Sequence, residues 1–350
     1  MIRTPLTELL GIRYPIVQTG MGYVSGAGLT AATARAGGLG VIGSATMSLP
    51  ELRTTIRQVR ERTDAPFGVN LRADADDAAD RVELIVKEGV RVASFALAPK
   101  PELLRRLKDA GVITMPSVGA RRHAEKVAKW GADVVVVQGG EGGGHTGQVP
   151  TGLLLPQVVD AVDVPVVAAG GFFDGRGLVA ALAYGAAGIA MGTRFLLTSD
   201  SPVGDAVKQV YLAKTLTDTV VTTRVDGVPH RVLRTPLIDG LERAGGPARL
   251  VRAVRNAAAF RALSGLSWAA MLRQGAAMRH GSGLNWSQVL MAANTPMLLK
   301  AAMVDGRPDL GVMSAGQVVG VIEDLPSCAE LIERIMAEAC TCLDRLKAVR

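Results

Sequence analysis

The sequence has few cysteines, only three in 350 residues, and all three lie near the C-terminus: Cys328, Cys340 and Cys342. Their spacing fits neither a zinc-ligand motif nor a disulfide framework. No other set of His, Cys, Asp and Glu residues has the spacing of a metal site. We therefore expect no bound metal and a reducing compartment, the cytoplasm.

The sequence also lacks an apolar run long enough to cross a membrane. Its longest uncharged apolar stretch, between Arg176 and Arg194, has 17 residues rich in Gly and Ala, whereas a membrane helix needs about 20 strongly apolar ones. The N-terminal region carries Arg3, Glu8 and Arg13 and has no apolar core of signal-peptide length. These absences favour a soluble protein that is neither secreted nor in contact with a membrane.

Aromatic residues are scarce at 4%, but 48% of the side chains are apolar and 41 residues are glycine. Such a chain can bury a large core, which excludes a disordered or disulfide-stapled protein. The length of the chain allows one α/β barrel of about 250 residues with an appendage.

The basic residues are concentrated in one segment. Residues 206–300 contain 13 Lys and Arg against 4 Asp and Glu, a net charge of +9, while the whole chain carries +7 and the remainder therefore carries −2. For a single arginine, a solvated helical surface is the simpler interpretation. For the whole segment, the excess indicates a local anionic partner, and it argues against general binding to nucleic acid.

Short β-branched runs alternate with longer helical patterns between residues 15 and 195. Such alternation is typical of repeated βα units and of a parallel sheet that is covered on both faces. Eight runs fit strands: 15–21, 39–45, 67–71, 92–97, 112–118, 133–138, 165–171 and 188–195. They predict the α/β class and a (β/α)8, or TIM, barrel, because a Rossmann sheet would need fewer units and a different phosphate loop.

Residues 49–62, 77–88 and 101–110 space their apolar groups as helices do, and Gly89 and Gly111 follow two of them where a left-handed helix end is expected.

The strand pattern ends after residue 195. Residues 206–300 show helical patterns, at 250–263 and 268–279, and we expect a smaller, mostly helical lid there. We expect residues 1–205 and 301–350 to form the barrel, with a final amphipathic helix over 328–349 packed back on it.

Glycines and polar groups gather where strands end, which is where a barrel carries its site. Gly20 and Met21 follow the first strand, and Asn70 ends the third, where an amide can bond the edge of a heterocycle. Backbone N–H groups at the ends of strands seven and eight form the usual phosphate site of a barrel. The residues expected there are Gly170, Gly171, Gly192 and Thr193.

A glycine-rich loop, residues 138–147, follows the sixth strand and contains His145, one of only four histidines. A lone histidine is usually structural, but six glycines around this one leave little to pack against. An imidazole titrates near neutrality, so we expect His145 to be the catalytic acid or base. A phosphate cradle, an amide and one base suggest bound FMN. A sugar-phosphate isomerase remains an alternative.

Several of these motifs together resemble the nitronate monooxygenase, or 2-nitropropane dioxygenase, family of FMN enzymes. The enoyl-thioester reductases of bacterial fatty-acid synthesis share the plan. The resemblance covers nearly the whole chain and is carried by residues 18–21, 68–70, 140–145, 169–171, 174–176, 192–195 and 314–317.

This resemblance implies roles for individual residues. Gly20, Met21 and Asn70 would contact the flavin, and Gly143 and Gly144 would line its ring beside His145. The phosphate would be held by Gly170, Gly171, Gly192 and Thr193. The cofactor side would be completed by Ser117, where some members have Lys, and by Gln317 of the C-terminal motif.

A more specific resemblance, carried by residues 115–117, 221–224 and 286–290, is to actinobacterial flavin oxidoreductases that act on CoA thioesters in steroid C/D-ring degradation. It implies hydride transfer that makes or reduces a carbon–carbon double bond. The basic lid fits the phosphates of CoA, and we expect Arg224, His230 and Arg231 to bind the substrate.

Three alternatives stay open: a nitronate monooxygenase, an enoyl-thioester reductase and a non-enzymatic flavin- or CoA-binding scaffold. NAD(P)H as a second redox partner and a homodimer as the assembly also stay open.

Overall fold

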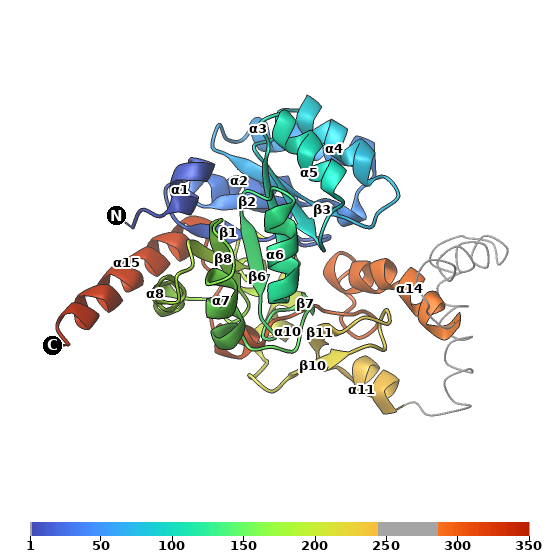
Figure 1. Ribbon diagram of the computed structural model, residues 1–350. Helices are drawn as coiled ribbons and strands as arrows, with labels where there is room; N and C mark the ends of the chain where they lie inside the picture. The colour runs from blue at the N-terminus through green and yellow to red at the C-terminus, as the bar shows by residue number, and fades with distance from the viewer. Residues whose placement is uncertain (1, 244–285, 350) are drawn as a thin grey trace.

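Eight parallel strands close into a barrel in the computed structural model, which describes residues 2–243 and 286–349 (Figure 1). The strands are β1 (Ile16–Gln18), β2 (Leu39–Gly43), β3 (Phe67–Arg72), β4 (Val92–Ala96), β5 (Ile113–Val118), β6 (Val135–Gln138), β8 (Val166–Ala169) and β9 (Gly188–Met191). Closure is seen at Val17 of β1, which pairs with Leu39 of β2 on one side and Ala190 of β9 on the other. The predicted TIM barrel and all eight of its strands are confirmed.

Helices cover the outside of this barrel. They are α2 (Ala27–Arg35), α3 (Leu49–Arg60), α4 (Ala78–Lys87), α5 (Pro101–Asp109), α6 (Arg121–Lys129), α7 (Thr151–Val159), α8 (Gly175–Ala183) and the short α9 (Thr193–Leu196), with a 3-10 turn η1 (Ser44–Thr46). The local sequence sets their ends: Ser48 and Glu51 form a reciprocal capping box at α3. Gly89 and Gly111 adopt φ of 57° and 72°, as predicted for the ends of α4 and α5.

The interior of the barrel is filled by side chains, and its amino-terminal end is plugged by α1 (Pro5–Leu10). Leu6 and Leu10 of α1 are fully buried and belong to the same apolar cluster as Val17, Val41 and Val167 of the strands. Because α1 covers this end, we look for the site at the carboxyl ends of the strands, where a barrel of this kind carries it.

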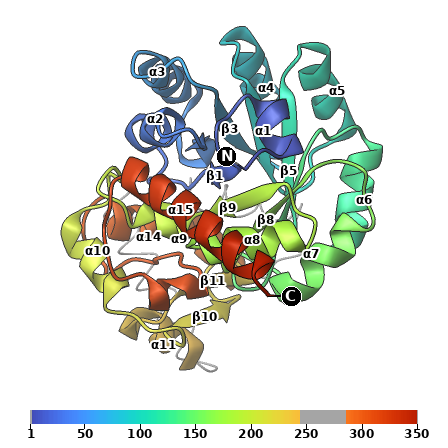
Figure 2. The ribbon, with the colours of Figure 1, turned by 90° about the vertical axis from the view of Figure 1, so that its left-hand side faces the viewer.

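The last helix, α15 (Cys328–Lys347), runs beside α8 on the outside of the barrel (Figures 1 and 2). A Cβ atom on Gly175 of α8 would lie 2.4 Å from the carbonyl oxygen of Ile335 and from the nitrogen of Ala339. The two helices can approach this closely only because residue 175 is glycine. The final helix therefore packs against α8 on the outside of the barrel.

The remaining elements gather on the side of the barrel away from the two termini (Figure 1). They are α10 (Asp205–Leu212), β10 (Thr219–Thr222), β11 (His230–Leu233), α11 (Pro236–Arg243), α14 (Trp286–Met303) and the 3-10 turn η2 (Gln317–Val321). Strands β10 and β11 form an antiparallel pair that β7 (Gly144–His145), from the loop after β6, extends to three strands. This sheet was not expected from the sequence. The two predicted lid helices, 250–263 and 268–279, lie outside the described residues.

In the described ranges, no helix combines the length and the apolar character that crossing a bilayer requires.

Candidate functional site

Three strand ends meet closely at the carboxyl end of the barrel. A Cβ atom on Gly20, after β1, would lie 2.4 Å from Cβ of Asn70 on β3. Gly192, after β9, faces Met21, whose sulfur would be 3.4 Å from a Cβ at residue 192. The structure thus brings Gly20, Met21, Asn70 and Gly192 together, and two glycines allow main chain and side chain to come this near.

The ends of β8 and β9 expose backbone donors. Gly170 and Gly171 have φ of 92° and 89°, so both peptides take a conformation that other residues rarely adopt. Within residues 2–243 and 286–349, the N–H groups of Gly171 and Gly192 donate to no protein atom. The Thr193 hydroxyl oxygen lies beside them and accepts a hydrogen bond from the N–H of Gly316 at 2.9 Å. Free N–H groups at a helix start suit a terminal phosphate.

The glycine-rich loop after β6 packs against the segment that contains Gln317. A Cβ on Gly143 would lie 2.5 Å from the backbone of Ala315, and the N–H of Gln317 donates to the carbonyl of Glu141 at 3.0 Å. The Glu141 carboxylate in turn accepts from the Thr151 hydroxyl at 2.7 Å. Two motifs that are far apart in the sequence are therefore held together at the barrel mouth.

The other predicted cofactor residues lie nearby on the same loop and strands. Gly144 begins β7, has φ of 74° and would have open space around a Cβ atom. Ser117, on β5, pairs with Val136 and is half-buried. Contact of these two residues with the cofactor stays a prediction.

His145 is held at the edge of the small antiparallel sheet. It pairs directly with His230 of β11, and opposed residues of an antiparallel pair project on the same face. The two rings are 4.7 Å apart between centroids. The Gln138 amide donates to the carbonyl of His145 at 2.9 Å, which fixes the backbone of the loop. About half of the His145 side chain, 50%, stays exposed.

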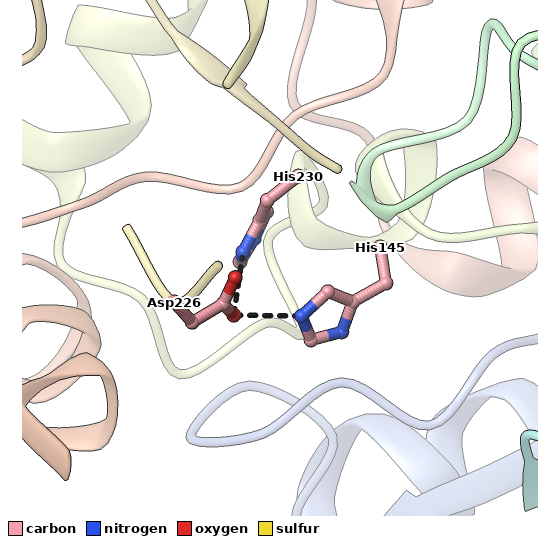
Figure 3. A group of neighbouring side chains, drawn as sticks. All are labelled: His145, Asp226 and His230. Atoms are coloured by element: carbon pink, nitrogen blue, oxygen red, sulfur yellow. Dashed lines mark hydrogen bonds and ion pairs between the residues drawn. The ribbon is translucent and has the colours of Figure 1, made fainter. Parts of the chain in front are cut away.

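Asp226 completes this group (Figure 3). Its Oδ2 lies 2.7 Å from Nε2 of His145 and 3.4 Å from Nδ1 of His230. Asp226 was not among the residues expected from the sequence, although it is one of only four acidic residues in the basic segment. That scarcity was the available signal.

The three predicted substrate residues differ in their surroundings. His230 is buried, at 3% exposure, and its Nε2 lies 2.8 Å from the Ser314 hydroxyl. Arg231 donates twice to the carbonyl of Gly140, at 2.8 and 3.1 Å, and thereby ties β11 to the glycine-rich loop. Arg224 is half-buried, and no ion pair or side-chain hydrogen bond of its guanidinium is seen among the described residues. Within that part of the chain its donors are left for an anion, and a substrate contact of all three stays a prediction.

His145, Asp226 and His230 are also of the types that bind metals, and their ligand atoms lie within 4.8 Å of one another. These atoms are already paired with each other, so the group is satisfied without an ion. The expectation of no bound metal stays a prediction.

Comparison with known families decides what kind of barrel this is. The family model described as nitronate monooxygenase matches residues 3–338. The chain belongs to the nitronate monooxygenase family. This membership confirms the resemblance identified from the sequence and makes the chain an oxidoreductase.

Matches to individual proteins are more specific than the family match. The chain is 64% identical over 351 residues, with 99% of each chain covered, to the Mycobacterium tuberculosis (3aS,4S,5R,7aS)-5-hydroxy-7a-methyl-1-oxo-octahydro-1H-indene-4-carboxyl-CoA dehydrogenase. It is 59% identical, over 100% of this chain and 99% of the relative, to the protein of the same name from Rhodococcus jostii. The solved structure of FabK from Thermotoga maritima superposes with a TM-score of 0.82, at 33% identity and with both chains fully covered.

The nitronate monooxygenase family consists of flavin enzymes, so the site must accommodate a flavin. The residues present fit one. Gly20 and Gly143 lie where a Cβ would collide with Asn70 and Ala315, and Gly171 and Gly192 leave N–H groups for a phosphate. The half-exposed His145 follows Gly143 and Gly144 on the same loop, and its role as the acid or base stays a prediction.

Proposed function

We propose that this chain is an FMN-dependent dehydrogenase that introduces a double bond into a ring activated by a CoA thioester. The observation that carries the proposal is His145, presented at the mouth of the barrel beside the glycine cradle. The substrate class is supported by two relatives, at 64% and 59% identity, whose names describe a carboxyl-CoA dehydrogenase. An anionic substrate of this class also fits the +9 charge of residues 206–300.

The cofactor would be held by the residues assembled at the strand ends. Gly171, Gly192 and Thr193 would hold the phosphate through N–H and hydroxyl donors, while Asn70 and Gly143 would face the ring. When bound, FMN would accept a hydride. In the proposed reaction this hydride comes from the substrate carbon that is β to the thioester carbonyl.

His145 would take the accompanying proton. A thioester carbonyl acidifies the hydrogen on the adjacent α-carbon, and the relatives' substrate carries its carboxyl-CoA group on a saturated ring carbon. The substrate then loses one proton from the α-carbon and one hydride from the β-carbon, and the electron pair left by the proton forms the double bond. Arg224, with its uncommitted donors, would bind an anionic group of the substrate.

Two other reactions of the same barrel have specific support. The family description favours oxidation of nitronates by oxygen. The likeness to FabK, at a TM-score of 0.82, favours reduction of an enoyl thioester, for which NAD(P)H would be the second redox partner. A homodimer and a cytoplasmic location remain part of the proposal.

The test is anaerobic bleaching of the bound flavin by a panel of acyl-CoA esters and by nitroethane. We expect a saturated cyclic carboxyl-CoA to bleach the wild-type protein, and His145→Gln to lower the bleaching rate by about 10²-fold or more while flavin remains bound. His123→Gln is the matched control, because His123 is exposed on α6 outside the site. Rapid turnover of alkyl nitronates with no bleaching by any acyl-CoA would refute the proposal, and undiminished bleaching in His145→Gln would give the imidazole a structural role only.

A further inference from the structure

Asp226 lies between two imidazoles and is shielded from water (Figure 3). Its Oδ2 is 2.7 Å from Nε2 of His145 and 3.4 Å from Nδ1 of His230, and its Oδ1 accepts from the N–H of Val228 at 3.2 Å. Only 8% of the residue is exposed. A buried carboxylate is stable when donors surround it, so this one favours a proton on the facing nitrogen of each ring.

The charge of Asp226 fixes which atom of His145 can act as a base. Burial alone raises the pKa of the Asp226 carboxyl, but hydrogen bonds from His145 and His230 outweigh burial and hold this pKa far below its ordinary value. The group is therefore a carboxylate at neutral pH. An anionic acceptor opposite Nε2 selects the His145 tautomer with a proton on Nε2, which leaves the lone pair on Nδ1.

The carboxylate is itself held from its other side. Because Nδ1 of His230 faces Asp226, Nε2 of His230 is the acceptor for the Ser314 hydroxyl at 2.8 Å. The carbonyl of Ser314 accepts from the buried Tyr211 hydroxyl at 2.9 Å. This chain of contacts anchors the carboxylate to the barrel-mouth segment that carries Gln317.

The order of Ser314, His230 and Asp226 is also that of a nucleophilic triad, but the other half of such a site is missing. The N–H groups after Ser314 are already used: Ala315 donates to the carbonyl of Arg231 at 3.4 Å, and Gly316 donates to Thr193 at 2.9 Å. Neither can stabilise an oxyanion on a carbonyl attacked by Ser314. The contacts therefore favour a positioning function over acyl transfer.

We propose that Asp226 is the positioning residue of His145: it orients the imidazole, makes Nδ1 its proton-accepting atom and stabilises the imidazolium that forms. The inference rests on the proposed role of His145 as the base. Other charged groups also face this site. His230 on β11 contacts the carboxylate. Arg72 of β3 forms a 2.6 Å ion pair with Asp74, and Arg72 interacts electrostatically with Asp226 as Asp74 does with His145.

The first experiment is ¹⁵N NMR of the flavin-loaded protein with labelled histidine, where four rings can be assigned from single substitutions. We expect wild-type His145 to carry its proton on Nε2, and Asp226→Asn to give a mixture of both tautomers. In kinetics, Asp226→Asn should lower kcat about 10²–10⁴-fold.

Asp226→Glu should restore part of kcat, and Asp309→Asn, at an exposed aspartate, is the control that should change neither readout. A wild-type proton on Nδ1, or an unchanged His145 tautomer in Asp226→Asn with flavin bound, would overturn the positioning role. Zn²⁺ alone shifting the His145 and His230 signals together at micromolar concentration would show a metal site instead. The tautomer needs no substrate, so lack of acyl-CoA activity with the expected tautomer would refute only the proposed reaction.

Discussion

Gly143 has no room for a side chain. A methyl group there would lie 2.5 Å from the backbone of Ala315 and Gly316, so either the glycine-rich loop or the 314–317 segment would have to move. We expect Gly143→Ala to lower the free energy of unfolding by about 1–3 kcal/mol. Flavin affinity should fall as well, about 10-fold or more, since both displaced segments line the predicted cofactor site. Thermal unfolding and fluorescence titration with FMN measure the two effects.

Gly204→Ala is the matched control for this substitution, because a Cβ at Gly204 meets nothing within 4 Å and the backbone there is not left-handed. If Gly143→Ala bound FMN as tightly as Gly204→Ala does, the loop would not contact the flavin.

Some of these residues could be predicted from the sequence and others could not, for a physical reason. Gly20, Asn70 and Gly192 end strands of one parallel barrel, and the carboxyl ends of such strands always converge. Asp226 reaches His145 only because a hairpin brings residues 81 positions apart together. The positions of His145 and Asp226 in the sequence do not predict their contact.

Arg231 ties its own strand, β11, to two neighbouring elements. Its guanidinium donates to the carbonyl of Gly140 at 2.8 and 3.1 Å and to the Thr219 hydroxyl at 3.0 Å, so it connects the glycine-rich loop, β11 and β10. We expect Arg231→Lys to lose the paired contact to Gly140, since an ammonium cannot reproduce the guanidinium fork. His145 would then be less well placed, and kcat should fall about 10-fold with little change in flavin affinity.

Steady-state kinetics with the cyclic acyl-CoA measure this, with Arg106→Lys as the control: Arg106 makes a similar forked contact to Glu83, on the far helices α4 and α5. A change in KM alone at residue 231 would instead support the direct substrate contact predicted from the sequence.

Strands differ in how well a sequence reveals them. The barrel strands are buried on both faces and read as β-branched runs, such as 135–138 and 166–169. Strands β10 and β11 have four residues each, Val221 is exposed, and β11 begins with His230 and Arg231. Such a short strand, with polar residues that make specific contacts, lacks the alternation of apolar and polar residues by which strands are identified. The small sheet therefore went unpredicted.

The charge of the molecule is distributed unevenly along its sequence. Of the 13 basic residues in 206–300, six lie between residues 248 and 279, outside the described residues, whereas all four acidic residues lie among the described ones. Several of the described bases are paired, as Arg243 is with Asp239 at 3.7 Å. Arg224 has no such acidic partner among the described residues, so its guanidinium is a candidate to meet an incoming phosphate or carboxylate.

If Arg224 meets the charges of CoA, its effect must depend on salt. We expect kcat/KM of the wild-type protein to fall as ionic strength rises, because salt weakens the attraction between exposed charges. At physiological concentrations the screening length is about 8–10 Å. Arg224→Ala should raise KM about 10-fold at low salt, as loss of one charge-assisted hydrogen bond does, and its kcat/KM should vary less with salt. Arg243→Ala removes the same charge from an exposed, already paired position and should keep the wild-type dependence. Equal salt slopes for all three proteins would mean that Arg224 does not recognise CoA, whatever the overall charge of the segment.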